Sequence, residues 1–255
     1  MLESSGGARE PARGRAGSID RWAKRAIDVI VPLVLLIVLS PVVLACAAAI
    51  KFESRGPVFY RARRMGRGGR ELHVLKFRKM VDGAAGQALT GDRDPRFTRM
   101  GRFLASSKLD ELPQLWNVLL GGMSLVGPRP EDPGFVRLHD REYREILVVR
   151  PGVTGLSQLA FAKEAEILDP DDRVGHYVGQ ILPQKVELDR RYALTRSVAM
   201  DIRILVWTVL PVLLRRDVAV NRATGRLTLR RRQPVGASSS SSLVDLDQDS
   251  SPSVR

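Results

Sequence analysis

The chain is 255 residues long and strongly basic, with 41 lysines and arginines against 28 aspartates and glutamates, a formal net charge of +13. This length suffices for one sizeable core, and the charge favours anionic partners such as nucleic acid, an anionic lipid leaflet or phosphorylated substrates. Nucleic acid is not expected, because aromatic residues make up only 5% and no zinc-finger or RNA-binding signature is present. The single cysteine excludes an intramolecular disulfide, and three scattered histidines argue against a histidine-based metal site.

Both ends of the chain have the composition of disordered segments. Residues 1–18 are rich in glycine, arginine, serine and alanine, and residues 233–255 contain a serine run with few apolar anchors. Between them the sequence predicts a membrane helix–break–helix over residues 19–56 and a folded domain over residues 57–232.

The apolar run from Val29 to Ile50 contains no charged residue and is long enough for ~33 Å of helix. Its length favours a transmembrane helix, but Ser40 and Pro41 lie in its middle, where proline removes a backbone hydrogen bond and bends a helix. Both flanks are basic, and the positive-inside tendency keeps both on the cytoplasmic side. We therefore favour a re-entrant helix over the two alternatives, a straight span and a cleaved signal peptide.

Beyond residue 56 the pattern predicts a small β-hairpin followed mainly by helices. The two strands are expected at residues 57–63 and 72–78, with glycines between them. The later elements, in chain order, are a polar loop leading into a short helix at 92–102, a helix at 112–120, a turn at 151–155 and a helix over 185–214. Residues 202–214 suit either the membrane interface or the core. The expected fold class is therefore α+β and mainly helical, with a membrane-associated, proline-broken re-entrant helix, a small β-hairpin and interfacial helices.

Two adjacent carboxylates, Asp110 and Glu111, stand near the start of the predicted helix at 112–120. Helix capping is one explanation, with Ser107 and Asp110 as a capping box and Pro113 in the first turn. Neighbouring residues on a helix point ~100° apart, however, so two consecutive carboxylates cannot serve one cap equally well. A catalytic role for the two carboxylates is therefore the second explanation.

The surrounding sequence is rich in side chains that bind phosphate: Lys76, Arg78, Lys79, Arg96, Arg99, Arg102 and Arg129. Such charges are often only solvated surface, but Arg129 stands between Pro128 and Pro130, which restrict its backbone. A planar guanidinium held in this way suits bidentate phosphate recognition. A carboxylate can attack a diphosphate only if a divalent cation and basic side chains neutralise the phosphoryl oxygens. The apolar segment suggests that one substrate is a lipid.

A series of motifs runs along roughly residues 21–214: Lys24 to Asp28, Ser40-Pro41, Ile50 to Phe59, Lys76 to Met80, Asp94 to Thr98, Leu109 to Leu119, Met123 to Pro130, Arg150 to Gly155, and Asp201. In this order they resemble the bacterial sugar transferases, the monotopic polyprenyl-phosphate phosphoglycosyl transferases. The resemblance implies transfer of a phospho-sugar from a UDP-sugar to undecaprenyl or another polyprenyl phosphate, with release of UMP and a requirement for Mg²⁺. Such a reaction initiates the synthesis of a cell-surface polysaccharide or glycoconjugate.

The resemblance also implies roles for residues. Asp110 would be the nucleophile that forms a covalent aspartyl phospho-sugar intermediate, Glu111 would assist it, and both carboxylates would contribute to the metal site. Residues 57–232 would be the catalytic domain on the cytoplasmic face of the bacterial inner (cytoplasmic) membrane, in contact with membrane lipid.

The resemblance assigns nucleotide or phosphate binding to three residues: Lys76, Arg78 and Arg129. Ser40 and Pro41 would break the re-entrant helix. The chain departs from many family members at Ala62, Ala105 and Ala162, where those members carry polar side chains. These losses leave a catalytically inactive membrane scaffold of the same fold as the alternative. The donor sugar and a homo-oligomeric state are left open.

Overall fold

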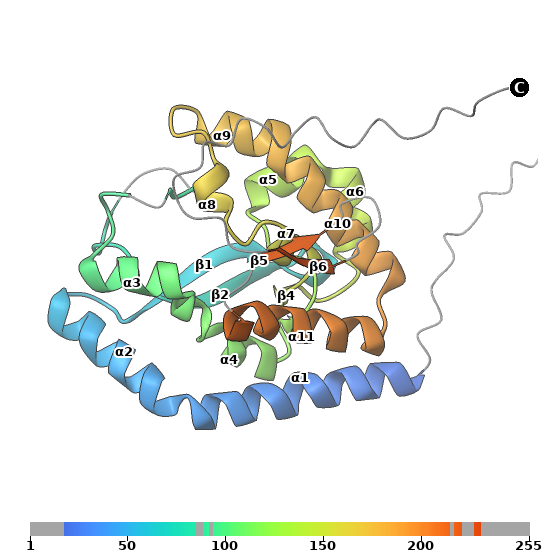
Figure 1. Cartoon of the computed structure of the whole chain (residues 1–255), viewed down its shortest axis with the longest axis horizontal. Coiled ribbons are helices and arrows are strands. Elements are labelled where there is room, and N and C mark those ends of the chain that lie inside the picture. Colours follow the sequence, from blue (N-terminus) through green and yellow to red (C-terminus); the bar gives the residue numbers. More distant parts are fainter. Residues whose placement is uncertain (1–17, 85–88, 92–93, 215–216, 221–226, 231–255) are drawn as a thin grey trace, which may run out of the picture.

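The computed structural model describes residues 18–84, 89–91, 94–214, 217–220 and 227–230. The segments expected to be disordered, residues 1–18 and 233–255, lie outside the described residues apart from position 18. Within the described part of the chain, helices predominate and the strands form two-stranded sheets (Figure 1).

The α-helices, in chain order, are α1 (Ser18–Val38), α2 (Ser40–Glu53), α3 (Arg99–Ser107), α4 (Gln114–Leu119), α5 (Pro133–Leu138), α6 (Asp140–Ile146), α7 (Leu156–Ala160), α8 (Glu164–Ile167), α9 (Arg173–His176), α10 (Leu182–Thr195) and α11 (Val198–Leu214). Short 3₁₀ turns form η1 (Arg67–Gly69) and η2 (Leu109–Glu111), and η3 (Tyr177–Ile181) is a π-helix. The strands are β1 (Phe59–Met65), β2 (Glu71–Phe77), β3 (Ser124–Val126), β4 (Gly152–Thr154), β5 (Asp217–Val220) and β6 (Leu227–Arg230).

The expected hairpin is confirmed. Strands β1 and β2 pair antiparallel from Phe59 opposite Phe77 to Met65 opposite Glu71. At the tip, Gly68 and Gly69 have φ values of 70° and 72°, a left-handed backbone that favours glycine. The glycines of this segment therefore allow the chain to reverse.

The turn expected at residues 151–155 is wrong. Gly152–Thr154 forms β4, which pairs in parallel with β3, so that Ser124 lies opposite Gly152 and Val126 opposite Thr154. A Cβ on Gly152 would lie 2.1 Å from the backbone nitrogen of Gly127, so the close approach of the two chains requires glycine. Proline and glycine by themselves indicate a turn, and a local pattern does not contain the strand partner that lies 28 residues away.

Helices α1 and α2 meet at the expected break, bent by 62°. Pro41 lies in the first turn of α2, where its missing N–H costs no helical hydrogen bond, and the Ser40 hydroxyl donates to the Ile37 carbonyl at 2.8 Å. Among the described helices none has by itself the length and apolarity to cross a membrane, although this bent pair passes that test together by length and composition. The break is confirmed, while its re-entrant placement stays a prediction.

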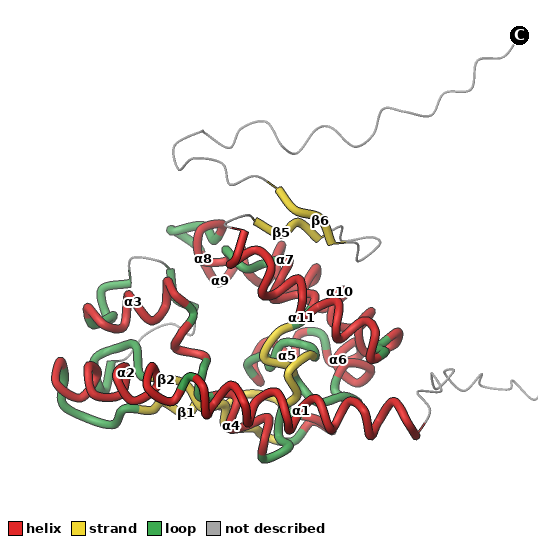
Figure 2. Tube along the Cα trace, turned by 60° about the horizontal axis from the view of Figure 1, so that its bottom comes forward, coloured by secondary structure: helices red, strands yellow, loops and turns green. Residues whose placement is uncertain are grey.

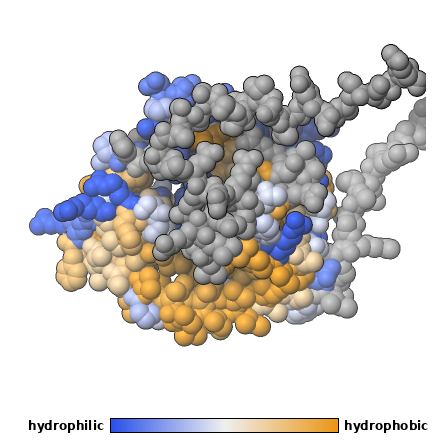
Figure 3. Space-filling view, in the orientation of Figure 1, coloured by the Kyte–Doolittle hydropathy of each residue, from blue (hydrophilic) through white to orange (hydrophobic). Residues whose placement is uncertain are grey.

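Large apolar side chains remain exposed along α1 and α2: Trp22, Ile30, Leu33, Val34, Ile37, Val38, Val42, Leu44 and Phe52. Figure 3 shows hydrophobic surface gathered on the side where Figure 1 places α1. In both Figures 1 and 2, α1 runs beside α4, and α1 also contacts β3 and α11. The apolar helix is thus attached to the folded domain along one side and uncovered along the other.

The expected helix over 185–214 is two helices, because α10 ends at Thr195 and α11 starts at Val198. Arg196 between them has an extended ψ of 139°. On α11, Ile204 is buried in the main core while Ile202 and Val206 stay about half exposed. One side of α11 therefore packs on the core, and an interfacial role for its other side stays a prediction.

Candidate active site

The Asp110-Glu111 pair sits in a short turn between two helices. Helix α3 ends because Lys108 adopts a left-handed backbone, with φ 60°, and the chain then forms the 3₁₀ turn η2 before Pro113 and α4. The Ser107 hydroxyl donates to the Phe103 carbonyl at 2.7 Å, and η2 has no side-chain cap. The capping-box explanation is therefore wrong, and the two carboxylates are directed elsewhere.

Each carboxylate faces one lysine: Lys76 lies in β2, and Lys79 lies two residues after that strand ends. Lys79 Nζ lies 3.0 Å from Asp110 Oδ2, and Lys76 Nζ lies 3.0 Å from Glu111 Oε1. The Asp110 residue is only 2% exposed, whereas the Glu111 side chain keeps 24% of its surface exposed. The two acids thus occupy different environments although they are neighbours in sequence.

The main chain of Lys79 is fixed against the start of α3. Its carbonyl accepts from the Thr98 backbone N–H at 3.1 Å, and a Cβ on Gly101 would lie 1.8 Å from that same carbonyl oxygen. Glu53, at the end of α2, accepts hydrogen bonds from the backbone N–H groups of Arg99 and Met100 at 2.7 and 2.9 Å. The N-terminus of α3 is therefore capped from the apolar helix pair, and this cap places α3 beside Lys79.

The main chain next to Lys76 is fixed by a side chain. Asn117, on α4, accepts from the Leu75 N–H at 2.8 Å and donates to the His73 carbonyl at 2.9 Å. Its carboxamide thus continues the β2 hydrogen-bonding edge as a third strand would. Because α4 begins three residues after Glu111, Asn117 ties the strand that carries Lys76 to the turn that carries Glu111.

Nearby cations keep Glu111 ionised. Burial alone would raise its pKa, but Lys76 and Arg129 outweigh burial and lower the pKa to about 2. Burial and Arg129 in turn lower the pKa of Lys76, against the opposing effect of Glu111. At neutral pH, Glu111 is therefore a carboxylate that accepts hydrogen bonds or binds cations and is no proton donor.

Arg129 follows the parallel strand β3. Gly127 N–H donates to the Thr154 carbonyl at 2.9 Å and Gly152 N–H to the Pro128 carbonyl at 2.8 Å, which hold the segment against β4. The backbone N–H of Arg129 donates to Asp189 Oδ2 at 3.2 Å. No hydrogen bond or ion pair engages its guanidinium within the described residues, so this planar fork is available to a ligand.

A largely buried charged cluster, made of Glu131 and of residues from α8, η3 and α10, lies beside Arg129. Lys185 Nζ lies 2.8 Å from Glu164 Oε2, 2.8 Å from the Tyr177 hydroxyl and 3.6 Å from Glu131 Oε2. Tyr177 donates to Glu131 at 2.7 Å. Burial lowers the pKa of Arg129, but Glu111, Glu164 and Glu131 raise it above its ordinary value overall. The cluster therefore surrounds the Arg129 guanidinium with negative charge.

The sequence-based expectation missed this cluster. Lys185 and Asp189 are both 2% exposed and lie one turn apart on α10. Burial raises the pKa of Asp189 to about 7, and its Oδ1 atom has no hydrogen-bond partner. The sequence does contain a signal for these residues: two charged residues at an i, i+4 spacing on the apolar face of a predicted helix indicate a buried polar site.

The structure brings together most, though not all, of the expected site residues. One small pocket is lined by Arg64, Val74, Lys76, Glu111, Gln114, Arg129, Pro130, Gly152 and Val153. Arg78, by contrast, is 6% exposed and donates to the Arg55 and Ser54 carbonyls and to the Ser54 hydroxyl at 2.6, 3.0 and 2.8 Å. It ties β2 to the end of α2, and its phosphate-binding role stays a prediction. Ser40 and Pro41 lie at the helix break.

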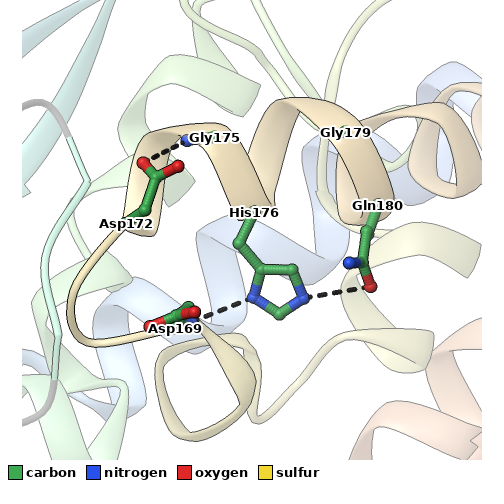
Figure 4. A pocket seen from close by; sticks show the side chains of 6 residues that line it. All are labelled: Asp169, Asp172, Gly175, His176, Gly179 and Gln180. Carbon is green, nitrogen blue, oxygen red and sulfur yellow. Dashed lines mark hydrogen bonds between the residues drawn. The ribbon is translucent and has the colours of Figure 1, made fainter.

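A second, wider pocket opens on α9 and η3 and is lined by Asp169, Asp172, Gly175, His176, Gly179 and Gln180 (Figure 4). His176 Nδ1 accepts from the Asp169 N–H at 2.9 Å, and its Nε2 lies 3.2 Å from Gln180 Oε1. Asp172 accepts from the Gly175 N–H at 2.8 Å, as an N-cap does. The polar groups of this pocket are thus engaged locally.

The described residues contain no group of three or more His, Cys, Asp or Glu side chains placed to hold a metal ion. A site made of protein ligands alone is therefore not found in this part of the chain. Asp110 and Glu111 offer two carboxylates, which is the donor set by which proteins usually hold Mg²⁺ jointly with substrate phosphates and water.

Comparison with known proteins points to one family. The family model of the bacterial sugar transferases matches residues 19–215. The chain is 37% identical over 199 residues to UDP-N-acetylgalactosamine-undecaprenyl-phosphate N-acetylgalactosaminephosphotransferase of Aeromonas hydrophila, covering 75% of this chain and 44% of that protein. It is likewise 37% identical over 203 residues to UDP-glucose:undecaprenyl-phosphate glucose-1-phosphate transferase of Escherichia coli (strain K12), covering 75% of this chain and 40% of the relative.

The chain spans less than half the length of these two relatives. A shorter relative matches along almost its whole length: exopolysaccharide production protein PSS of Rhizobium leguminosarum bv. phaseoli is 38% identical over 206 residues, which is 77% of this chain and 98% of that protein. The matched region includes the carboxylate turn, β2 and the segment that carries Arg129.

Proposed function

Because the chain belongs to the bacterial sugar transferase family, we propose that it transfers a phospho-sugar from a UDP-sugar to undecaprenyl phosphate or another polyprenyl phosphate and releases UMP. The names of the Aeromonas and Escherichia relatives support both substrate classes. The name of the Rhizobium relative supports a place in polysaccharide synthesis. The observation that carries the proposal is the pairing of Asp110 and Glu111 with Lys79 and Lys76 beside the unengaged guanidinium of Arg129.

Asp110 is the proposed nucleophile. One of its carboxylate oxygens forms a bond to the phosphorus that bears the sugar, the diphosphate P–O bond breaks, and its electron pair leaves with UMP. An oxygen of the polyprenyl phosphate then attacks the same phosphorus and displaces Asp110. Two observations support this role. Asp110 is deeply buried, so water is largely excluded from it. Lys79 lies next to it and can interact with the phosphoryl oxygens.

Glu111 supports the reaction without transferring a proton. With a pKa of about 2 it remains a carboxylate at neutral pH, suited to hold a cation or to orient Lys76. Arg129 is the proposed phosphate ligand, because its backbone is held by β3, β4 and Asp189 while its guanidinium is unengaged.

Asp110 and Glu111 would hold Mg²⁺ together with the donor phosphates. When bound there, Mg²⁺ supplies neutralisation of the phosphoryl charge. Lys76, Lys79 and Arg129 add positive charge from the protein at the same place.

The proposed location is the cytoplasmic face of the bacterial inner membrane, with α1 and α2 entering one leaflet. The 62° bend, the exposed apolar side chains of both helices and basic residues on both flanks support this placement. Tags placed before Arg21 and at the C-terminus should both be protected inside spheroplasts. Opposite sides would show that the pair spans the membrane.

The function is tested with a panel of UDP-sugars, undecaprenyl phosphate and Mg²⁺, with UMP release as the readout. At least one donor should give UMP in a reaction that depends on both acceptor and Mg²⁺. If the whole panel gives none, the chain is the catalytically inactive membrane scaffold instead.

A further inference from the structure

Three arginines from separate parts of the chain lie along the segments that lead into β3 and β4. Arg25 lies on α1, Arg67 lies at the hairpin tip, and Arg150 precedes β4. None of the three belongs to the carboxylate turn or to the pocket that contains Arg129. The proposed reaction gives them no task.

Hydrogen bonds to backbone carbonyls bring Arg67 close to the segment that carries Arg150. Arg67 Nε donates to the Val148 carbonyl at 3.1 Å, and the Gly68 N–H donates to the Leu147 carbonyl at 2.7 Å. The hairpin tip is therefore docked on the segment that leads directly into Arg150.

Arg25 reaches the same place from α1. Its guanidinium donates to the Val118 and Leu119 carbonyls at 3.1 and 2.9 Å, at the C-terminal end of α4. One turn further along α1, Asp28 accepts from the Leu125 N–H of β3 at 2.9 Å. The strand β3 starts at Ser124, whose N–H donates to the carbonyl of Pro151, the residue after Arg150.

The cluster has a surplus of positive charge. Within the described residues, no hydrogen bond or ion pair engages the Arg150 side chain, which is partly buried. Asp28, the nearby carboxylate, contacts Ser124, Leu125 and Lys24 through Oδ1, while its buried Oδ2 has no hydrogen-bond partner among the described residues, so one negative charge faces three arginines. Burial and the charges of Arg25 and Arg67 lower the pKa of Arg150, as expected where like charges meet. An anion bound among the three would relieve this repulsion.

Exposed apolar side chains accompany these cations. Trp22, one turn before Arg25, is 78% exposed; Leu120, next to a carbonyl that Arg25 binds, is 71% exposed; and Val148, whose carbonyl Arg67 binds, is 53% exposed. Exposed apolar side chains would not contribute to the binding of a free inorganic anion. The combination of cations and exposed apolar side chains is typical of a surface at the level of lipid headgroups.

We infer that Arg25, Arg67 and Arg150 form a binding site for the phosphodiester headgroup of an anionic phospholipid, beside the apolar face of α1. This site rests on the proposed membrane location and is distinct from the acceptor-phosphate site. Lys76 lies five residues along β2 from Glu71 at the tip end of the hairpin, roughly 17 Å at strand spacing. The bound lipid would fix the height of the hairpin tip above the membrane.

The test is flotation of the full chain with vesicles of phosphatidylcholine alone or of phosphatidylcholine mixed with phosphatidylglycerol. The test variant is the double substitution Arg67→Gln and Arg150→Gln. Its matched control is Arg137→Gln with Arg141→Gln, which removes the same charge from two exposed arginines on or near α5 and α6. Far-UV circular dichroism and thermal unfolding check that both variants fold, and Arg150→Gln alone provides a milder change.

The wild-type chain should prefer the phosphatidylglycerol vesicles. The test variant should lose about thirtyfold in partition onto them, since each cation near an anionic surface is worth roughly fivefold, and should bind phosphatidylcholine vesicles unchanged. Equal losses in test variant and control would overturn the site, as would no loss in the test variant. Displacement of wild type by inorganic phosphate would overturn the headgroup assignment. Failure to bind any vesicle would contradict the proposed membrane location. UMP release tests the transfer reaction separately.

Discussion

Lys79 Nζ and Asp110 Oδ2 lie 3.0 Å apart, and this contact joins the segment that follows β2 to the turn before α4. Lys79 also stands 5.6 Å above the centre of the Phe97 ring. These contacts fix the orientation of both side chains. If either the carboxylate or the lysine rotated, it would lose its ion-pair partner in a buried environment. We propose different roles for the two acids, with Asp110 attacking phosphorus and Glu111 supporting it. The separate lysine that each acid contacts supports this proposal.

Asp110→Asn is expected to lower UMP release by roughly a thousandfold or more, because an amide is no nucleophile towards phosphorus. The wild-type chain incubated with a reactive UDP-sugar and no acceptor should show a phospho-sugar mass adduct on the peptide that contains Asp110. The control is Asp140→Asn, which changes an exposed aspartate on α6. Near-wild-type turnover of Asp110→Asn would reject this residue as the nucleophile.

Glu111 should contribute to stability in a defined pH range. Its pKa is about 2 in the folded chain against an ordinary 4.5, so the unfolded state binds the proton first as the pH falls. The contribution is present above about pH 4.5 and is lost as the pH approaches 2. Urea unfolding at several pH values should show this loss, and Glu111→Gln should show a smaller slope in the same range. An unchanged slope would contradict the ion pair with Lys76.

Asp189 should change the stability with pH in the opposite direction to Glu111. Burial raises its pKa from 3.8 to about 7, so between these values the folded state holds a proton that the unfolded state has lost. Stability therefore falls as the pH rises through this range. Asp189→Asn retains an acceptor for the Arg129 N–H and should flatten this fall in unfolding experiments. If Asp189→Asn instead becomes more destabilising as the pH rises from about 4 to 7, the carboxylate is already ionised in the folded chain in that range, and its pKa is not raised.

Asn117 should matter through the position of Lys76. Asn117→Leu removes both hydrogen bonds to β2 and is expected to cost about 1–3 kcal/mol of unfolding free energy. It should also raise the reactivity of Lys76 towards an amine-labelling reagent, measured by peptide mass spectrometry, because the pair with Glu111 loosens. Trp116→Leu, at the exposed neighbouring position on α4, is the control. Unchanged labelling of Lys76 would show that Asn117 only stabilises the fold.

Gly101 should tolerate no side chain despite its place in a helix. Alanine normally stabilises a helix relative to glycine by up to about 1 kcal/mol, but its Cβ here would lie 1.8 Å from the Lys79 carbonyl oxygen. Gly101→Ala should therefore destabilise the chain and displace Lys79 from Asp110, with reduced UMP release. Gly179→Ala, where a Cβ meets nothing within 4 Å, should leave thermal unfolding and turnover unchanged. Equal melting temperatures for both variants would contradict the close packing of α3 on Lys79.

Local pattern was enough to predict several elements. The hairpin followed from alternating residues around a glycine segment, the helix break from Ser40-Pro41, and α4 from apolar spacing after Pro113. Each of these features depends on residues close together in the chain, where backbone preferences act directly. The same locality explains the errors: Ser107 and Asp110 match a capping box, yet Lys108 turns left-handed and redirects both carboxylates.

By itself the sequence determined the basic and apolar character of the chain, the break between α1 and α2, the carboxylate pair and the resemblance to one family. Only the tertiary structure decided which charges meet. It set Lys79 against Asp110 and Lys76 against Glu111, turned Arg78 inward to the end of α2, and made residues 152–154 a strand beside β3. The physical reason is that Coulomb interactions and strand pairing depend on distance in space, and these partners come from segments far apart in the chain.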